Sequence, residues 1–390
     1  MTQQNSEDRQ TRIANALAGG WVADAASLGL HWLYDSNRIA EVAGQTPEFL
    51  TPSADYFGRG FGFFAHGGKR AGDVSHYGAA TKVLTDSLVA CDGKLNVRDY
   101  QRRFQSYFGP GGDWQGYIDN PTRITLQNLI NNEQKAIEQG LAAIKTPLTD
   151  KQKRILVQKV MPYTRRLTGD QLVKPVRDAI NLTYSEIEIQ EAGVVLAQTI
   201  DQQMLPESGA DDTQLPAVSK LPPLVACYTG KDELLAQVEA AVRATNHNDD
   251  AVAWAKCAAR LLETVFRGGS LSDALEHAAK EAPDRTKLDT ALASKSLDAV
   301  TAGDTYGRTC YLHEAMPVIF HIISHAESFT DAIRANIHCG GDSCGRAWII
   351  GPVMAALKGV GHPNGVPLSW LAKVTDAASL YADIEALTGD

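Results

Sequence analysis

The chain has 390 residues, of which 44% are hydrophobic and 21% are charged, and its formal net charge is -9 at pH 7. This composition is sufficient for a buried core. The acidic balance argues against nucleic acid or an anionic membrane as a partner, because both bind clustered lysine and arginine. No apolar run reaches the roughly 18 residues that a membrane span requires. The cysteines are scattered through a chain that opens with the polar stretch MTQQNSEDRQ, so we expect a reducing compartment and a cytoplasmic location.

Segments with apolar residues at three- and four-residue spacing recur along the chain and predict helices. They cover residues 11–33, 79–91, 178–203, 233–244, 249–266 and 316–325. Alternating runs of β-branched residues are scarce, so the expected fold class is all-α. Residues 1–10 are predicted as a disordered N-terminal tail, and residues 11–390 as a single helical domain.

Three stretches rich in glycine, proline or aspartate are predicted as loops, at residues 45–72, 109–122 and 205–223. Long loops in a compact domain are often functional. Residues 145–174 are polar and rich in lysine and arginine, which predicts an exposed helix-turn region.

The stretch from residue 332 to residue 361, AIRANIHCGGDSCGRAWIIGPVMAALKGVG, contains the strongest candidate site. The pair Gly340 and Gly341 permits a sharp turn that brings Asp342 and Cys344 to the start of an apolar helix. Free N–H groups and the positive end of the helix dipole favour anions there and lower the pKa of a thiol. Cys344 is therefore a candidate nucleophile.

Three motifs resemble those of the ADP-ribosylglycohydrolase superfamily, in the same order. The first is ALAGGWVADA at residues 16–25, which places Asp24 at the aspartate of the family's opening helix. The second is RATNHNDD at residues 243–250, and the third is the glycine-pair segment followed by PLSW at residues 367–370. The three matches extend over nearly the whole chain.

Two shorter motifs are similar to one branch of this superfamily, the J-crystallin and selenoprotein J-like proteins. They are HWLYD at residues 31–35 and SHYG at residues 75–78. The resemblance implies an orthogonal packing of many helices around one cleft. It also implies an ADP-ribose-type small molecule or an ADP-ribosylated protein as the partner.

Enzymes of the family hold two magnesium ions with an early Thr-Asp-Asp trio and a late Asp-x-Asp-Thr run, because hard cations prefer carboxylate ligands. In this chain the early trio falls on Ser75, His76 and Tyr77, and the late run keeps only Asp342, since Cys344 replaces its second aspartate. The resemblance therefore implies a degraded two-magnesium site. Two residual sites stay open: one magnesium ion held by Asp342, Ser75 and water, or a zinc ion held by Cys344, His76 and Asp342.

A thiol site is the alternative to a metal site. Cys344 would be the nucleophile, His76 its proton partner and Asp342 the orienting carboxylate. Cys339 lies five residues earlier and could pair with Cys344 in a reversible disulfide. A simpler interpretation is that both cysteines are small buried residues.

Substrate-binding candidates are Asp24, Tyr77 and the pair Gly340 and Gly341, which the resemblance places along the cleft. His66 lies in the aromatic-glycine loop FGFFAHGG, which could stack on an adenine, cover the cleft or pack on the core.

Two other patterns have simpler interpretations. The sequence DDTQ at residues 211–214 reads like the end of the early metal motif, but its position favours a cluster of helix-capping residues. His321 and His325 share a helical face without a third ligand, which favours packing or surface exposure.

Two functional hypotheses follow. The first is an altered ADP-ribosylglycohydrolase that hydrolyses or binds ADP-ribose conjugates. The second is a non-catalytic, crystallin-like structural protein, or a thiol-based redox protein that uses Cys344. The loss of metal carboxylates favours an altered, inactive protein, and whether the chain is an enzyme stays open.

Overall fold

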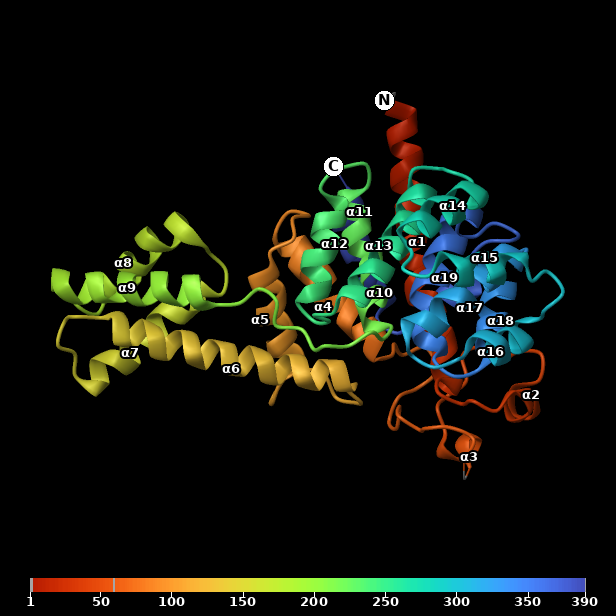
Figure 1. Ribbon diagram of the computed structural model, residues 1–390, viewed down its shortest axis with the longest axis horizontal. Coiled ribbons are helices and arrows are strands. Elements are labelled where there is room, and N and C mark those ends of the chain that lie inside the picture. Colours follow the sequence, from red (N-terminus) through yellow and green to blue (C-terminus); the bar gives the residue numbers. More distant parts are fainter. Residues whose placement is uncertain (1–2, 59, 390) are drawn as a thin grey trace.

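The computed structural model describes residues 3–58 and 60–389, and over this part of the chain every regular element is a helix (Figure 1). The β-bridges among these residues are isolated and form no sheet. The expected all-α class is therefore confirmed.

The helices divide between a large body and an arm that projects from it (Figure 1). The body begins with α1 (Gln3–Ser27), η1 (Leu28–Leu30), α2 (Ser36–Ala43), α3 (Ala54–Phe57), α4 (His76–Ala90) and α5 (Val97–Phe108). The arm is made of α6 (Asn120–Ala143), α7 (Asp150–Thr164), η2 (Gly169–Leu172), α8 (Val173–Asn181) and α9 (Ile187–Gln203). The chain returns to the body as α10 (Pro216–Ser219), α11 (Leu221–Tyr228), α12 (Leu234–Arg243), α13 (Asp249–Phe266), α14 (Leu271–Glu281), α15 (Arg285–Ala293), α16 (Ala299–Tyr306), α17 (Leu312–His325), α18 (Phe329–Cys339), α19 (Ser343–Lys358), α20 (Leu368–Leu371) and α21 (Ala377–Thr388).

The centre of the body is the contact between α1 and α19. The two helices approach closely because small residues face each other. A Cβ atom placed on Gly351 would lie 2.6 Å from Ala23 Cβ and 2.6 Å from the carbonyl oxygen of Gly19. Helix α19 is buried along nearly its whole length. A helix buried on all sides is expected to be mostly apolar, as α19 is. Its buried charged side chain, Arg346, donates hydrogen bonds to Asn336 Oδ1 at 2.8 Å and to the Gly340 carbonyl oxygen at 2.6 Å.

The arm has a hydrophobic core of its own. Its buried residues come from all four α-helices of the arm and are Ala136, Leu156, Val160, Met161, Val176, Ile180, Ile189, Ala192, Val194, Leu196, Ala197 and Ile200. The first half of α6 belongs instead to the body, where Leu126 and Leu129 join the main core. Helix α6 therefore connects two cores that are otherwise separate.

Polar interactions connect the body to the arm near the start of α5 and the end of α9. Arg98 forms an ion pair with the carboxylate of Asp201, and its Nη2 atom donates to the Asp201 carbonyl oxygen at 2.6 Å. Asn96 adds a hydrogen bond to the carbonyl oxygen of Arg166 at 3.0 Å. The expectation of one domain over residues 11–390 stays a prediction.

The helix predicted at residues 249–266 is present as α13, and Asn248 caps it by accepting hydrogen bonds from the N–H groups of Asp250 and Ala251 in the first turn. The helix predicted at residues 178–203 is interrupted. Helix α8 ends at Asn181, where the Thr183 N–H donates to the carbonyl oxygen of Ile180, three residues earlier, and so departs from the four-residue pattern of an α-helix.

Helix α1 begins at Gln3, within the segment expected as a disordered tail, and residues 1 and 2 lie outside the described chain. The disorder of that segment stays a prediction. One prediction at a chain segment needs correction. The second half of the loop predicted at residues 205–223 is helical. Prolines open α10 and α11, and a proline in a first turn removes an N–H that has no helical partner there.

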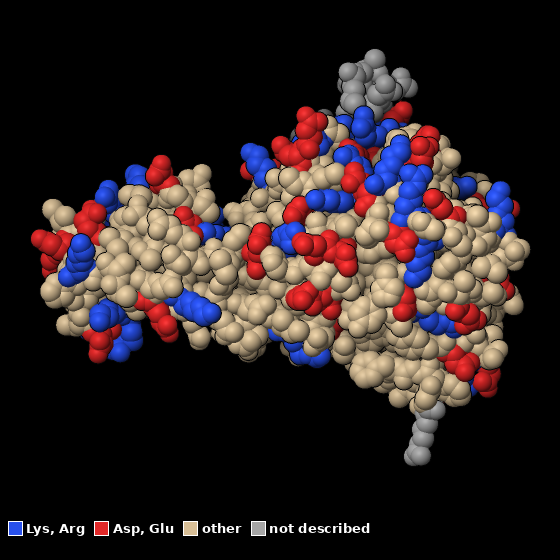
Figure 2. All heavy atoms as spheres, in the orientation of Figure 1, with Lys and Arg blue, Asp and Glu red and all other residues tan. Residues whose placement is uncertain are grey.

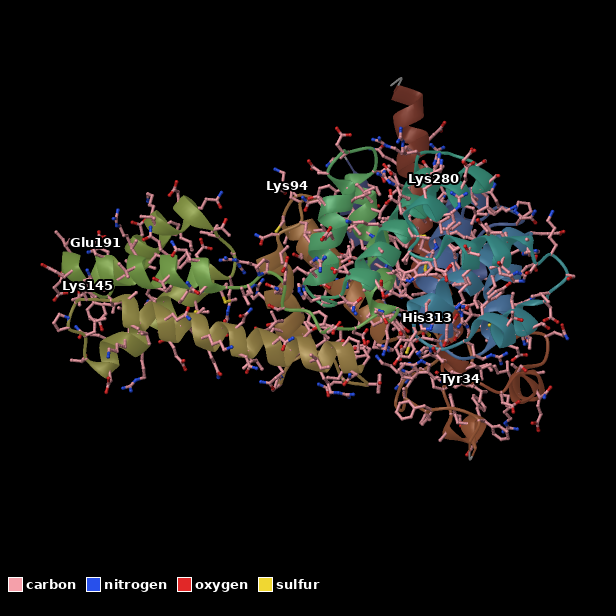
Figure 3. All side chains as sticks on the ribbon, in the orientation of Figure 1. Tyr34, Lys94, Lys145, Glu191, Lys280 and His313 are labelled. Carbon is pink, nitrogen blue, oxygen red and sulfur yellow. The ribbon has the colours of Figure 1, made fainter. Side chains whose placement is uncertain are left out.

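The surface in view carries acidic and basic side chains interspersed over both the arm and the body (Figure 2). None of the described helices is both long enough and apolar enough to cross a membrane. In Figure 3, Lys145 and Glu191 lie on the arm, whereas Tyr34 lies on the far side of the body.

Candidate functional site

A turn of two glycines places Asp342 at the start of α19. Gly340 and Gly341 have φ angles of 77° and 68°, which favour glycine. Gly341 exchanges backbone hydrogen bonds with the segment that follows η1: its carbonyl accepts from Trp32 at 2.8 Å and its N–H donates to Leu33 at 2.7 Å. The turn therefore joins two segments that lie about 300 residues apart in the sequence.

The carboxylate of Asp342 is fully buried and its oxygens are occupied. Oδ2 accepts hydrogen bonds from the Tyr77 hydroxyl at 2.6 Å and from Trp32 Nε1 at 3.2 Å. Oδ1 caps the helix by accepting from the Gly345 N–H at 3.0 Å. Burial raises the pKa of Asp342, and the hydrogen bond from Tyr77 opposes this rise.

Asp24 of α1 is tied to the start of α4 in the same way. Ser75 donates its hydroxyl to Asp24 Oδ1 at 2.6 Å and its N–H to Oδ2 at 2.8 Å. The same hydroxyl oxygen accepts from the Tyr77 N–H at 3.1 Å and so caps α4. Burial raises the pKa of Asp24 to about 7, although both hydrogen bonds from Ser75 lower it. Neither side chain is left free to hold an ion.

Cys344 lies in the first turn of α19 but is fully buried. Its Sγ atom lies 3.7 Å from the carbonyl oxygen of Asp24, and its N–H donates to His31 Nδ1 at 3.2 Å. Burial, together with the nearby carboxylates of Asp24 and Asp342, raises the pKa of the Cys344 thiol well above its usual value. This is the opposite of the lowering that a helix start predicts, because burial outweighs the helix dipole here. Cys339 is also a buried free thiol.

Three buried histidines gather beside Asp342, and each has at most 3% of its surface exposed. His31 follows η1, His66 comes from the aromatic-glycine loop, and His76 is the first residue of α4. One potential ligand atom from each ring lies within 4.8 Å of the other two. Burial lowers the pKa of all three, and for His31 and His66 the neighbouring histidines lower it further. The imidazoles are therefore neutral at physiological pH.

Aromatic side chains cover the histidines. The Trp32 ring packs edge-on against Tyr117 at 5.0 Å between centroids and lies 5.8 Å from Phe63. Tyr117 also packs edge-on against His76 at 5.4 Å. Phe63 is 54% exposed, so this cover borders on solvent. Aromatic rings therefore pack directly on the histidines where the resemblance implies a cleft.

A two-magnesium centre does not fit these donors. Asp342 and Ser75 are occupied by internal hydrogen bonds, and His76 and Tyr77 offer an imidazole and a phenol where hard cations need carboxylates. The zinc site expected from Cys344, His76 and Asp342 is not assembled either. The single group of three potential ligands found in the described chain contains His76, but with His31 and His66 as its companions.

The structure brings together most of the predicted residues. Asp24 with Ser75, and Tyr77 with Asp342, form direct hydrogen bonds, while the described contacts of Cys344 do not include His76. The sequence did not predict His31 or Asp119 as site residues, although Asp119 Oδ2 lies 3.5 Å from His76 Nε2. His31 was noted only as part of the motif HWLYD, which predicted no role for it. No regular spacing along the sequence relates residues 31, 66 and 76.

The DDTQ stretch does not cap a helix with its aspartates. Asp212 accepts from the Gln214 N–H at 2.8 Å and from Asn246 Nδ2 at 3.2 Å, which closes a turn ahead of α10. Burial raises the pKa of Asp212 to about 6. The buried Lys220 nearby is bonded to Thr245 and to the carbonyl oxygen of Pro216, so this cluster stabilises the fold. The His321 ring has main-chain oxygens near both nitrogens, as expected for packing.

The fold and the site together describe an all-helical protein in which internal hydrogen bonds occupy the carboxylates at the glycine turn. The profile of the ADP-ribosylglycohydrolase family matches residues 5–390, and the chain belongs to this family. Among its relatives, Crystallin J1A of Tripedalia cystophora is 25% identical over 393 residues, which is 98% of this chain and 98% of the relative. Crystallin J1B of the same organism is 25% identical over 378 residues, which is 95% of this chain and 94% of the relative.

A solved structure titled "ADP-ribosylglycohydrolase-related protein complex" has the same fold. Its TM-score is 0.62 at 15% identity, and the match covers 98% of both chains. The resemblance to the superfamily and to its J-crystallin branch is therefore confirmed.

Proposed function

We propose that this protein is a non-hydrolytic member of the ADP-ribosylglycohydrolase family with a crystallin-like structural role. The observation that carries the proposal is the Asp342 carboxylate. It is fully buried and accepts three hydrogen bonds from Tyr77, Trp32 and Gly345, so it is a structural group of the turn. The similarity to two crystallins over nearly the whole chain supports the same role.

A thiol-based activity receives no support from the geometry. A nucleophilic or redox cysteine needs an accessible thiolate, and Cys344 is buried with a raised pKa. A reducing, cytoplasmic compartment, expected from the sequence, belongs to the same proposal.

Binding of an ADP-ribose-type ligand without hydrolysis is a second candidate. A cleft of about 530 Å³ lies beside α4, and its lining includes Trp21, Lys69, Tyr107 and Trp114. The Lys69 ammonium lies 4.0 Å from the centre of the Trp114 ring. Aromatic rings and a lysine are groups that can hold a base and a diphosphate, although Asp73, Asp113 and Asp376 also line the cleft.

The test measures release of free ADP-ribose from ADP-ribosylated arginine, ADP-ribosylated serine and an ADP-ribose acetyl ester. Each substrate is incubated with the full chain in magnesium and in chelator, with an active family glycohydrolase in parallel. We expect no release and no rise of the melting temperature with magnesium. Magnesium-dependent release would overturn the non-hydrolytic assignment.

Titration calorimetry with ADP-ribose separates the two candidates. The structural role predicts no binding heat. Binding that is weakened by Lys69→Ala, but unchanged by Lys145→Ala on the arm, would favour the second candidate. Figure 3 shows how far Lys145 lies from the body.

A further inference from the structure

The three buried histidines lack the hydrogen bonds that buried rings normally make. Both nitrogens of His66, both of His76 and Nε2 of His31 have no hydrogen-bond partner among the described residues. Buried polar atoms are paired in the large majority of cases, so each unpaired one requires an explanation. Here five such atoms belong to a single cluster.

The geometry points to a missing common partner. The rings of His31 and His66 lie 5.2 Å apart, those of His66 and His76 lie 5.8 Å apart, and those of His31 and His76 lie 5.9 Å apart. One nitrogen from each ring falls in a group whose members are all within 4.8 Å of one another. A neutral imidazole has a lone pair on one nitrogen, and it is the commonest metal ligand in proteins.

A carboxylate lies close to a ring nitrogen of two of the three histidines. Asp342 Oδ1 lies 3.7 Å from His31 Nδ1, and Asp119 Oδ2 lies 3.5 Å from His76 Nε2. A metal-bound histidine usually directs its second nitrogen to a carboxylate, which orients the ring and makes it a better ligand. The two carboxylates would also balance the charge of a divalent cation in this buried place.

We propose that His31, His66 and His76 form a three-histidine binding site for a divalent transition-metal ion, and that this ion is zinc. Imidazole nitrogens suit zinc, whereas magnesium and calcium require oxygen ligands. The site uses different residues and a different chemistry from the two-magnesium centre of the family. It goes beyond the proposed structural role and does not depend on it.

Binding requires a small inward movement of the rings. Zn–N bonds of about 2.05 Å place tetrahedral ligand nitrogens about 3.4 Å apart, whereas these nitrogens lie within 4.8 Å of one another, so they must approach by up to about 1.4 Å. His66 lies in a loop and is followed by Gly67 and Gly68, where such a movement is easiest. When zinc takes Nε2 of His31, the ring proton moves to Nδ1 and faces Asp342. The ring then exchanges its hydrogen bond from Cys344 for one to the carboxylate.

The first test is a calorimetric titration of the metal-free full chain with zinc chloride, with metal content measured by mass spectrometry after dialysis. We expect one zinc ion per chain. The variant His66→Phe keeps a ring of similar size and breaks no hydrogen bond, so it should fold. Removing one of three ligands should lower the affinity more than the roughly 100-fold that loss of an outer carboxylate costs.

His325→Phe is the matched control, because His325 is exposed on α17 and lies outside the cluster. It should bind zinc as the wild type does. Wild-type protein that retains no zinc, or His66→Phe that binds zinc with unchanged affinity, would overturn the proposal. If His66→Phe fails to fold, X-ray absorption at the zinc edge of the wild-type protein tests the proposal by identifying the ligand atoms around the bound zinc. A shell with three imidazole nitrogens supports the site, and a shell with fewer contradicts it.

Discussion

The arm and the centre of the body are both built from helices, but they use polar groups in opposite ways. The core of the arm is apolar and comes from one continuous segment, α6 to α9. The centre of the body instead buries Asp24, three histidines and Asp342, which come from both ends of the chain. The comparison teaches that the arm depends on local sequence pattern, while the centre depends on contacts that only the complete fold supplies.

The largest expected effect concerns Asp24 and pH. Its pKa rises from 3.8 in the unfolded chain to about 7 in the folded protein, so the folded protein holds one more proton between these values. Stability from this group is therefore lost as pH rises from about 4 to about 7, by on the order of 4 kcal/mol. Asp24→Asn cannot titrate and should not show this loss.

Urea unfolding of the wild type and of Asp24→Asn at several pH values tests this prediction. The informative quantity is the difference in the free energy of unfolding between the two proteins at each pH, because the other carboxylates contribute equally to both. If this difference stayed constant from pH 4 to pH 8, the pKa of Asp24 would be the same in the folded and unfolded chain. The centre of the body would then tolerate the charged carboxylate.

The next largest effect lies in the arm. Leu156→Ala removes a fully buried side chain from the small apolar core and should cost about 3 kcal/mol. Because the arm has a core of its own, the loss should fall mainly on α7, α8 and α9. Native-state hydrogen exchange resolves this: faster exchange in the arm with unchanged α1 and α19 is expected. Equal acceleration in all helices would mean that arm and body unfold as one unit.

A pair of glycine variants compares the two regions directly. In Gly351→Ala the new methyl group meets the Gly19 carbonyl oxygen and Ala23 Cβ, so α1 and α19 must separate at a cost of about 1–3 kcal/mol. In Gly193→Ala, in α9, the nearest atom is the end of the Ile180 side chain, which can turn away. That variant should change the stability by less than about 1 kcal/mol, since alanine favours the helix. Equal losses of stability in urea would contradict the difference in packing.

The smallest expected effect comes from the Tyr77 hydroxyl. Tyr77→Phe leaves Asp342 without its shortest hydrogen bond and should cost about 1–2 kcal/mol. It should also raise the pKa of Asp342 further, because that hydrogen bond lowers it. Tyr184→Phe, at the edge of the arm core, is the control and should stay within about 0.5 kcal/mol of the wild type. A neutral result for Tyr77→Phe would show that Trp32 and Gly345 satisfy the carboxylate alone.

The secondary structure was largely predictable because helix periodicity and capping act over a few residues. Residues 249–266 show the pattern well, with an apolar face and a capping Asn248 before it. Predictions failed where proline had two interpretations, as at α10 and α11, since it can open a helix as well as exclude one.

The sequence by itself determined the helical class, the family and the glycine turn that carries Asp342, because these follow from local pattern and from motifs in order. Only the tertiary structure decided the chemistry of the site. Burial turned Cys344 from a predicted reactive thiol into one with a raised pKa, and the folding of distant segments brought His31, His66 and His76 together. Desolvation and proximity depend on the whole packed chain, and no spacing along the sequence encodes them.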